Sequence, residues 1–358
     1  MSEEPLFTAL ATSTKQLYLL LRAISFTSHA NLYILSEGIR VTTEDARTIQ
    51  ASTLLDKSLF SSYLLRNSTD SSVAPFKINI LALLEVLQIF GGGDTNSTYR
   101  SSNGGITSTY AAAFNTPALG LGGTCRISYA DVGAPLSITI EEAGVKTTCQ
   151  MNTYNLTNMY DEDFEIPLDR TALVLKSILP SVWLHDAVSE LASTSSDTMV
   201  VNVSSTSAPY FALEGHGGPF GDTTVDFNPD SKNDHLSGSN VRRKQPQITE
   251  TFVVSAPAGS HSRVRQRYKF DLIKRAGRAM ALANKVSIRL DKQGVLSFQF
   301  MVEAVDPNGV GNDGTFDMTA NSGRLSFIDF RFVPLLDQSD GEDDNEGDTA
   351  AMDLEEDS

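Results

Sequence analysis

The sequence predicts an α+β protein built from two similar halves, and three observations lead to this prediction. A chain of 358 residues is longer than the chains that usually form one hydrophobic core, and its length suits two domains. Segments with helical periodicity alternate with short runs that have the composition of strands. The same order occurs twice along the chain: a strand, a helix, three or four strands, a helix and three strands. Such a repeat is expected of a duplicated domain.

The first half is expected to contain two helices. An amphipathic helix covers Lys15–Ile24, where leucines recur at helical spacing on one face. A second helix is predicted over Pro75–Phe90, because proline suits a first helical turn and the three glycines at 91–93 end it. Strands are expected between the helices at residues 31–36, 39–43 and 48–55, and after them at 124–129, 136–141 and 146–153.

The second half repeats this order. A helix is predicted over Pro180–Leu191 and a long one over Tyr268–Asn284. The last strand, residues 324–333, alternates apolar with polar side chains, as a half-buried strand does. The other strands are expected at residues 171–177, 199–204, 210–214, 223–227, 252–256, 286–290 and 295–302.

These elements predict how the chain divides. Residues 1–153 form the first domain, 154–168 a connector between the domains, and 169–336 the second domain. Polar stretches at 91–105 and 229–247 are expected to be long loops within the two domains. The last 22 residues, 337–358, are too acidic and too poor in apolar residues to form a core, and we expect a disordered tail.

Charge is distributed unevenly along the chain. The net charge is −16, and Asp337–Asp357 contains 11 acidic residues and no lysine or arginine, which leaves −5 for the rest. Within that body, Arg242–Arg289 holds 12 lysines and arginines against two acidic residues. A basic segment in an acidic protein indicates a partner with negative charge, such as nucleic acid.

Basic residues on the predicted helices form the candidate surface for nucleic-acid phosphates. Lys15 and Arg22 share one side of the first helix, and Lys274, Arg275 and Arg278 share a face of the last. A solvated helix face is the plainer interpretation of such a row, but strongly basic helices are unexpected in an acidic body. The candidate residues are Lys15, Arg22, Lys77, Lys269, Lys274, Arg275, Arg278 and Lys285.

No sequence motif indicates catalysis. The chain contains no phosphate-binding Gly-x-x-x-x-Gly-Lys-Ser/Thr loop, no His-Glu-x-x-His pair and no nucleophile elbow. The acidic run Asp161–Glu165 could bind metal ions for a nuclease, but its place between the halves favours a solvated linker. We therefore predict no catalytic residue, no metal site, no cofactor and no small-molecule substrate.

Secretion and membrane insertion are not expected either. The N-terminus lacks a basic start followed by an apolar core. The most apolar stretch, Ile78–Phe90, is shorter than the roughly 20 residues that span a bilayer. Cys125 and Cys149 are too few for a disulfide framework and are predicted to be reduced thiols in strands of an intracellular protein.

Short segments in a fixed order give the chain a likeness to a known family. It resembles the Rad-one/Rec-one checkpoint clamp subunits over residues 5–334, excluding the two polar stretches and the tail. The segments that carry the resemblance are Pro5–Ala9, Leu20–Phe26, Ile34–Thr42, Ile49–Tyr63, Trp183–Leu191, Pro209–Phe211, Tyr268–Ile273, Lys285–Arg289 and Gly294–Met301.

The resemblance implies a sliding-clamp fold, with helices lining a central hole and antiparallel sheets outside. It also implies a heterotrimeric ring with Rad-nine-like and Hus-one-like subunits, placed on DNA in the nucleus by a clamp loader. Such a ring recruits checkpoint and repair factors. The basic residues named above would line its hole and bind DNA independently of sequence.

Three other functions stay open at this point. The first is a 3′-5′ DNA exonuclease, for which Asp161, Glu162 and Asp163 are the candidate carboxylates. The second is a homotrimeric replication clamp, and the third is a scaffold of the same fold that does not bind DNA.

Overall fold

The computed structural model describes residues 4–11, 14–66, 73–91, 124–142, 145–156, 164–227, 250–255, 263–303 and 325–336. Apart from Gly91, the predicted polar loops at 91–105 and 229–247 lie outside these residues, as does the predicted tail at 337–358.

The described part of the first half contains helices α1 and α2, of which α1 has about the predicted length. Helix α1 buries Leu17, Leu20, Leu21 and Ile24, the residues whose spacing indicated it. The elements of this half are β1 (Phe7–Ala11), α1 (Thr14–Ile24), β2 (His29–Ile34), β3 (Gly38–Asp45), β4 (Ile49–Asp56), the 3-10 turn η1 (Lys57–Leu59), β5 (Phe60–Leu65), β6 (Phe76–Asn79), α2 (Ile80–Gly91), β7 (Thr124–Tyr129), β8 (Leu136–Glu142), β9 (Val145–Met151) and β10 (Tyr154–Asn155).

The second half follows the same order of main strands and helices. Its last helical segment is divided in two where the first half has the single helix α2, and it has no counterpart of η1 or β10 among the described residues. The elements are β11 (Leu173–Pro180), α4 (Ser181–Ser193), β12 (Thr198–Ser204), β13 (Phe211–His216), β14 (Thr223–Asp226), β15 (Thr251–Val254), β16 (Arg263–Lys269), α5 (Phe270–Lys274), α6 (Gly277–Leu282), β17 (Lys285–Asp291), β18 (Leu296–Glu303) and β19 (Leu325–Phe332).

Strand pairing shows the duplication directly. One sheet of the first half has the order β5-β1-β7-β8-β9, and the second half repeats it as β15-β11-β17-β18-β19. The order β6-β2-β3-β4 recurs as β16-β12-β13-β14. All the strand pairs among the described residues are antiparallel, which fits the predicted α+β class.

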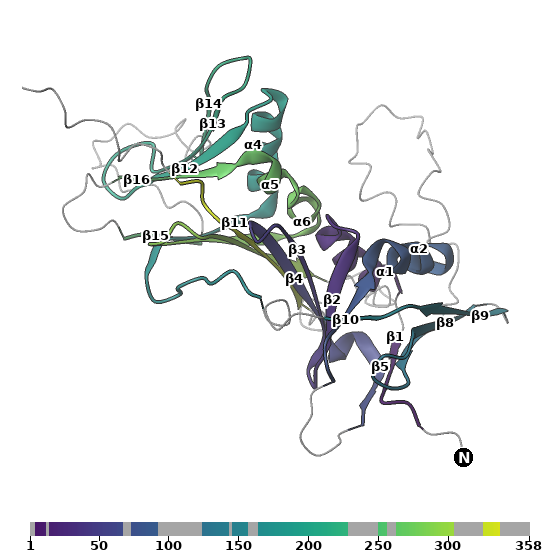
Figure 1. Cartoon of the computed structure of the whole chain (residues 1–358). Coiled ribbons are helices and arrows are strands. Elements are labelled where there is room, and N and C mark those ends of the chain that lie inside the picture. Colours follow the sequence, from purple (N-terminus) through teal and green to yellow (C-terminus); the bar gives the residue numbers. More distant parts are fainter. Residues whose placement is uncertain are drawn as a thin grey trace, which may run out of the picture.

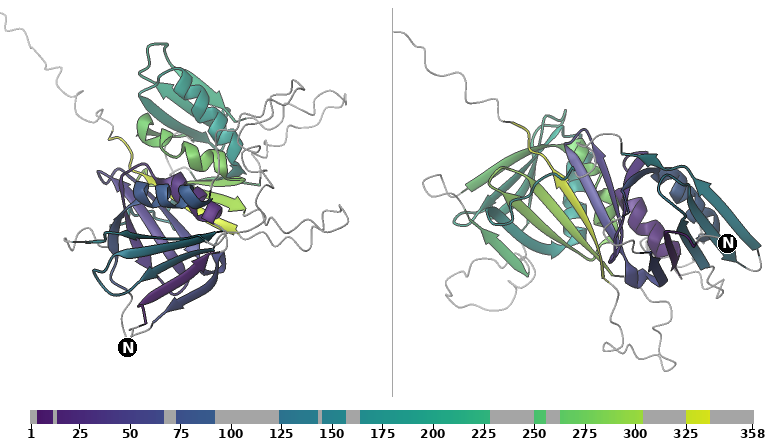
Figure 2. Two further views of the ribbon diagram at one scale, coloured as in Figure 1. Left: turned by 90° about the vertical axis from the view of Figure 1, so that its right-hand side faces the viewer. Right: turned by 60° about the horizontal axis from the view of Figure 1, so that its bottom comes forward.

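The two halves share one sheet. Strand β19 of the second half pairs with β4 of the first, from Ile328 opposite Thr53 to Phe332 opposite Ile49. The result is a ten-stranded sheet that runs from β10 to β15 across both halves. Helices α1, α2, α5 and α6 lie on one side of this sheet, along the inside of its curve (Figure 1). Turned views show the halves as two adjoining lobes (Figure 2).

Side chains also connect the two halves beside the shared sheet. The Arg275 guanidinium lies 2.5 Å from a carboxylate oxygen of Asp45 and 5.7 Å from the ring centroid of Phe26. Arg278 donates hydrogen bonds to the Ser25 hydroxyl at 3.1 Å and to the Arg22 carbonyl oxygen at 3.4 Å. Because that carbonyl lies in the last turn of α1, the cation also meets the negative end of the helix dipole.

Two predicted helices were wrong in part. Residues Pro75–Asn79, predicted to be helical, include strand β6, because Phe76 and Ile78 alternate into the core while β6 pairs with β2. Helix α2 begins only at Ile80, where the Asn79 side chain accepts a hydrogen bond from the Ala82 amide at 3.0 Å, as an N-cap does.

The long helix predicted over Tyr268–Asn284 is shorter and broken. Its first two residues belong to strand β16, and α5 and α6 are separated at Arg275 and Ala276. At the break, the amide of Arg275 bonds the carbonyl of Leu272 and that of Ala276 bonds Ile273, which is the tighter i to i−3 pattern. Gly277 follows directly, and glycine weakens a helix interior.

Substitution of Phe330 tests how much the apolar core beneath the shared sheet contributes to stability. Its ring is fully buried in β19 and lies 6.1 Å from that of Phe26 and 6.0 Å from that of Phe300, centroid to centroid. Phe330→Ala is expected to lower the free energy of unfolding by about 3–5 kcal/mol, because a large cavity is left between the halves. Phe327→Ala is the matched control, since this ring is 44% exposed on the other face of the same strand, and should cost about 1 kcal/mol or less. Urea denaturation measures both, and similar losses would contradict this account of the junction.

The Arg275–Asp45 pair is expected to contribute coupling energy across the halves. A double-mutant cycle with Arg275→Ala and Asp45→Ala should give about 0.5–1 kcal/mol, since solvent screens a pair in which Asp45 is 45% exposed. The matched cycle uses Lys274 and Asp271, which pair at 2.6 Å within one helical turn and are 44% and 66% exposed. That cycle should give only about 0.2–0.5 kcal/mol. A coupling energy for Arg275 and Asp45 no larger than that of the control would show that the pair does not hold the halves together.

Candidate nucleic-acid interface

Among the described helices, positive charge occurs only on α1 and the α5–α6 segment. Helices α2 and α4 contain neither lysine nor arginine. Helix α1 carries Lys15 and Arg22, α5 ends in Lys274, and α6 carries Arg278. Because Arg278 contacts the end of α1, helices α1 and α6 adjoin at the junction of the halves, on the same side of the shared sheet. We call the basic residues of α1, α5 and α6, together with Lys269 directly before α5, the junction surface.

Lys15, Arg22 and Lys269 present exposed cations on this surface. Partial burial lowers the pKa of the Lys15 ammonium. The Arg22 guanidinium lies 5.8 Å from the ring centroid of Tyr18, four residues before it on the same helix. Lys269 is the last residue of β16 and the residue before α5, so it lies beside the helix and not within it.

Lys274 is exposed but has an acidic neighbour. Its ammonium lies 2.6 Å from an Asp271 carboxylate oxygen and 5.4 Å from the ring centroid of Phe270. The hydrogen bond from Lys274, followed by its charge, lowers the pKa of the Asp271 carboxyl. A pair this exposed is weak and easily opened, so Lys274 can turn to an incoming phosphate at little cost.

Three candidate residues have structural partners that the sequence did not reveal. Arg275 is bound to Asp45, and Arg278 to the end of α1. Lys285 begins β17 and pairs with Glu250 at 2.5 Å. Arg275 and Arg278 therefore join the halves in addition to adding positive charge to the junction surface.

Lys77 was predicted on the second helix, and that placement is wrong. It lies in strand β6, opposite Asn31 of β2 and Tyr154 of β10. Its neighbours Phe76 and Ile78 are buried, so the alternation of a strand directs Lys77 to the opposite face of the sheet, away from the core. We omit Lys77 from the junction surface.

Of the acidic run between the halves, the structure describes only Phe164 and Glu165. Asp161, Glu162 and Asp163 lie outside the described residues, and Glu165 pairs with Arg331 at 2.6 Å. Within the ranges that the structure covers, no three His, Cys, Asp or Glu side chains are grouped as metal ligands.

Both cysteines lie in strands as free thiols, as predicted. Burial raises the pKa of the Cys125 thiol to about 11, which keeps it protonated and unreactive near neutral pH. Among the described helices, none is long and apolar enough to cross a bilayer.

Comparison with known proteins agrees with this geometry. The model of the family described as "Repair protein Rad1/Rec1/Rad17" matches residues 6–302. The DNA damage checkpoint control protein rad1 of Schizosaccharomyces pombe is 27% identical over 92% of this chain and 87% of its own length. The cell cycle checkpoint protein RAD1 of Mus musculus is 30% identical over 82% of this chain and 85% of its own length.

A solved structure shows the fold. The proliferating cellular nuclear antigen of Entamoeba histolytica superimposes with a TM-score of 0.58 at 13% identity, over 93% of this chain and all of that one. The chain thus has the sliding-clamp fold and belongs to the Rad1/Rec1/Rad17 family of repair proteins.

Proposed function

We propose that this chain is a non-catalytic subunit of a heterotrimeric DNA-damage checkpoint clamp that encircles DNA in the nucleus and recruits checkpoint and repair factors. Its partners are Rad-nine-like and Hus-one-like subunits, and a clamp loader places the ring on DNA. The observation that carries the proposal is the junction surface, a basic patch on the helix side of a clamp fold in a chain whose net charge is −16.

The junction surface suits DNA phosphates held without reading of sequence. Lys15, Arg22, Lys269 and Lys274 are long, exposed cations that reach phosphate oxygens without a fixed geometry. A ring that encloses the duplex needs only weak contacts of this kind, because escape is blocked by topology and not by affinity. Negative charge elsewhere on the chain disfavours DNA on other faces.

Internal duplication indicates which edges would close the ring. Strand β19 corresponds to β9 in the repeated order, and β4 corresponds to β14. Within the chain β19 pairs with β4, whereas β9 and β14 each end a sheet of the described residues. Two different edges on one chain support head-to-tail contacts, which close into a ring when the rotation allows. Pairing would also cover edges that otherwise invite aggregation.

DNA binding is tested through its salt dependence in the reconstituted three-subunit complex. Lys269→Gln/Lys274→Gln should reduce the slope of log affinity against log salt by about 1.8, because two phosphate contacts are lost. The measurement is duplex binding between about 50 and 200 mM salt, where such contacts dominate. The control, Lys57→Gln/Lys176→Gln, removes two exposed cations from η1 and β11 and should leave the slope unchanged. If both double variants lower the slope equally, the effect comes from the net charge of the chain and not from phosphate contacts at the junction surface.

Ring assembly is tested with proline at Thr147 and at Thr148 of β9 in separate variants. Successive amides of an edge strand point to opposite sides, so one of the two variants loses only a donor that faces away from β8. That variant should keep its unfolding temperature and fail to assemble with co-expressed partner subunits in size-exclusion chromatography. If both variants still assemble with the partner subunits, the β9 edge does not form a contact between subunits. A homotrimer formed by the wild-type chain alone would support a replication clamp instead.

A further inference from the structure

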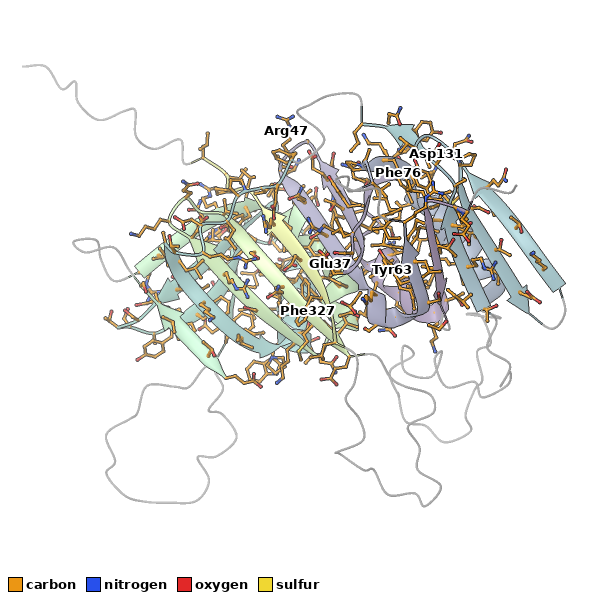
Figure 3. The ribbon with its side chains drawn as sticks, turned by 90° about the horizontal axis from the view of Figure 1, so that it is seen from below. Glu37, Arg47, Tyr63, Phe76, Asp131 and Phe327 are labelled. Atoms are coloured by element: carbon orange, nitrogen blue, oxygen red, sulfur yellow. The ribbon has the colours of Figure 1, made fainter. Side chains whose placement is uncertain are left out.

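The outer face of the shared sheet holds a cavity at the junction of the halves. Its volume is about 390 Å³, and its walls come from β2, β3, β4, β19 and residues 164–170, where the connector leads into the second domain. Figure 3 looks onto this side of the sheet, away from the helices, with Arg47 and Phe327 near opposite ends of the strands. The polar lining residues used below are Arg40, Thr42, Ser52, Arg170, Asp329 and Arg331.

The connector is fixed in place as one wall of this pocket. Gln50, only 6% exposed, donates to the Phe164 carbonyl oxygen at 2.5 Å and accepts from the Ile166 amide at 3.0 Å. Arg331 donates to the Ile166 carbonyl oxygen at 2.5 Å and pairs with Glu165 at 2.6 Å. Both halves thus hold the same short segment, so the pocket has a defined shape before any ligand arrives.

Positive charge exceeds negative charge around the pocket. Arg289 lies next to it, and burial, followed by the nearby charge of Arg170, lowers the pKa of its guanidinium. Burial raises the pKa of the Asp329 carboxyl, although the charges of Arg331 and Arg289 oppose this. Among the described residues that line the pocket, three guanidinium groups, those of Arg40, Arg170 and Arg331, face two carboxylates, those of Asp329 and Glu165.

Two of these arginines have guanidinium N–H groups that are available to a ligand. Arg40 on β3 and Arg170, two residues after the connector, are exposed, and neither has a hydrogen-bonded or ion-paired acceptor among the described residues. Arg40 lies 6.0 Å from the ring centroid of Tyr33, which orients its guanidinium without using the N–H groups. Thr42 and Ser52 add hydroxyl donors to the same pocket.

We propose that this pocket binds the phosphate of a phosphoserine or phosphothreonine on a partner protein. Such a group carries a charge of about −1.5 to −2, which suits a pocket whose described lining has more positive than negative groups. Planar guanidinium forks from Arg40 and Arg170 bind its oxygens in pairs.

DNA is disfavoured as the ligand because the pocket lies on the face opposite the junction surface. The chain's own acidic tail is disfavoured because the Leu335 amide bonds the Arg267 carbonyl oxygen at 2.8 Å, so the segment that leads to the tail runs along β16 in another sheet. All the walls belong to one chain, so the site does not depend on ring assembly.

Fluorescence anisotropy with the full-length chain tests the proposal. The probe is a fluorescein-labelled twelve-residue peptide of glycine, alanine and aspartate with one phosphoserine, and its twin carries serine. The phosphorylated peptide should bind at least about 10-fold more tightly, since charge-assisted hydrogen bonds are gained. Arg40→Gln/Arg170→Gln should abolish that difference, and Arg40→Lys/Arg170→Lys should restore it only in part, because lysine keeps the charge but not the fork.

A matched variant and two further measurements complete the test. Arg126→Gln/Lys57→Gln removes two exposed cations from β7 and η1 and should leave peptide binding unchanged. Unfolding temperatures of all variants establish that they fold, and inorganic phosphate should displace the peptide.

Equal affinity for the two peptides, or an equal loss of affinity in the matched variant, would overturn the proposal. Stronger displacement by duplex DNA than by phosphate would assign the pocket to nucleic acid. If the peptide binds only to a truncated chain that ends at Leu336, the acidic tail is the ligand that occupies the pocket in the full-length chain.

Discussion

The ladder between β4 and β19 is the interaction on which the rest of the structure depends. It joins residues about 275 positions apart, such as Thr53 and Ile328, and turns two five-stranded layers into one continuous sheet. Because the sheet is continuous, α1 and α6 are held against each other, and Arg278 reaches the end of α1. The same ladder aligns β3, β4 and β19 on the opposite face, where the connector closes the phosphate pocket. The two proposed binding surfaces therefore lie on opposite faces of the shared sheet, at the same junction between the halves.

Much of the fold could be predicted because its signals are local. Leucines at helical spacing indicated α1, and alternating side chains indicated β19, whose burial pattern follows that alternation. The errors arose where tertiary pairing outweighed local preference. Pro75 suits the start of a helix, yet pairing of β6 with β2 made the next residues a strand. Strands β1, β5 and β16 were given no predicted range, because their pairing with neighbouring strands, and not their local sequence, defines them.

The candidate site was only partly predictable, for a related reason. Cations on one helix face are visible as a spacing, so Lys15, Arg22 and Lys274 could be named from the sequence. Their partners could not be named, because Asp45 lies 230 residues from Arg275 and meets it only through the fold. The same reason hid the outer pocket, since Arg40, Arg170 and Arg331 come from three separate segments. A charge that looks free in the sequence can thus be a structural contact, and scattered charges can form a site.

The central claim is that the chain contributes to a ring which holds DNA by enclosing it. The most direct measurement compares the loaded complex on a closed circular duplex with the same duplex after it is cut once. We predict that the complex stays on the circle at high salt, where phosphate contacts are weak, and is lost from the linear form by sliding off its ends. Equal dissociation rates from the two forms would show that the contacts themselves hold the DNA, and would contradict the account.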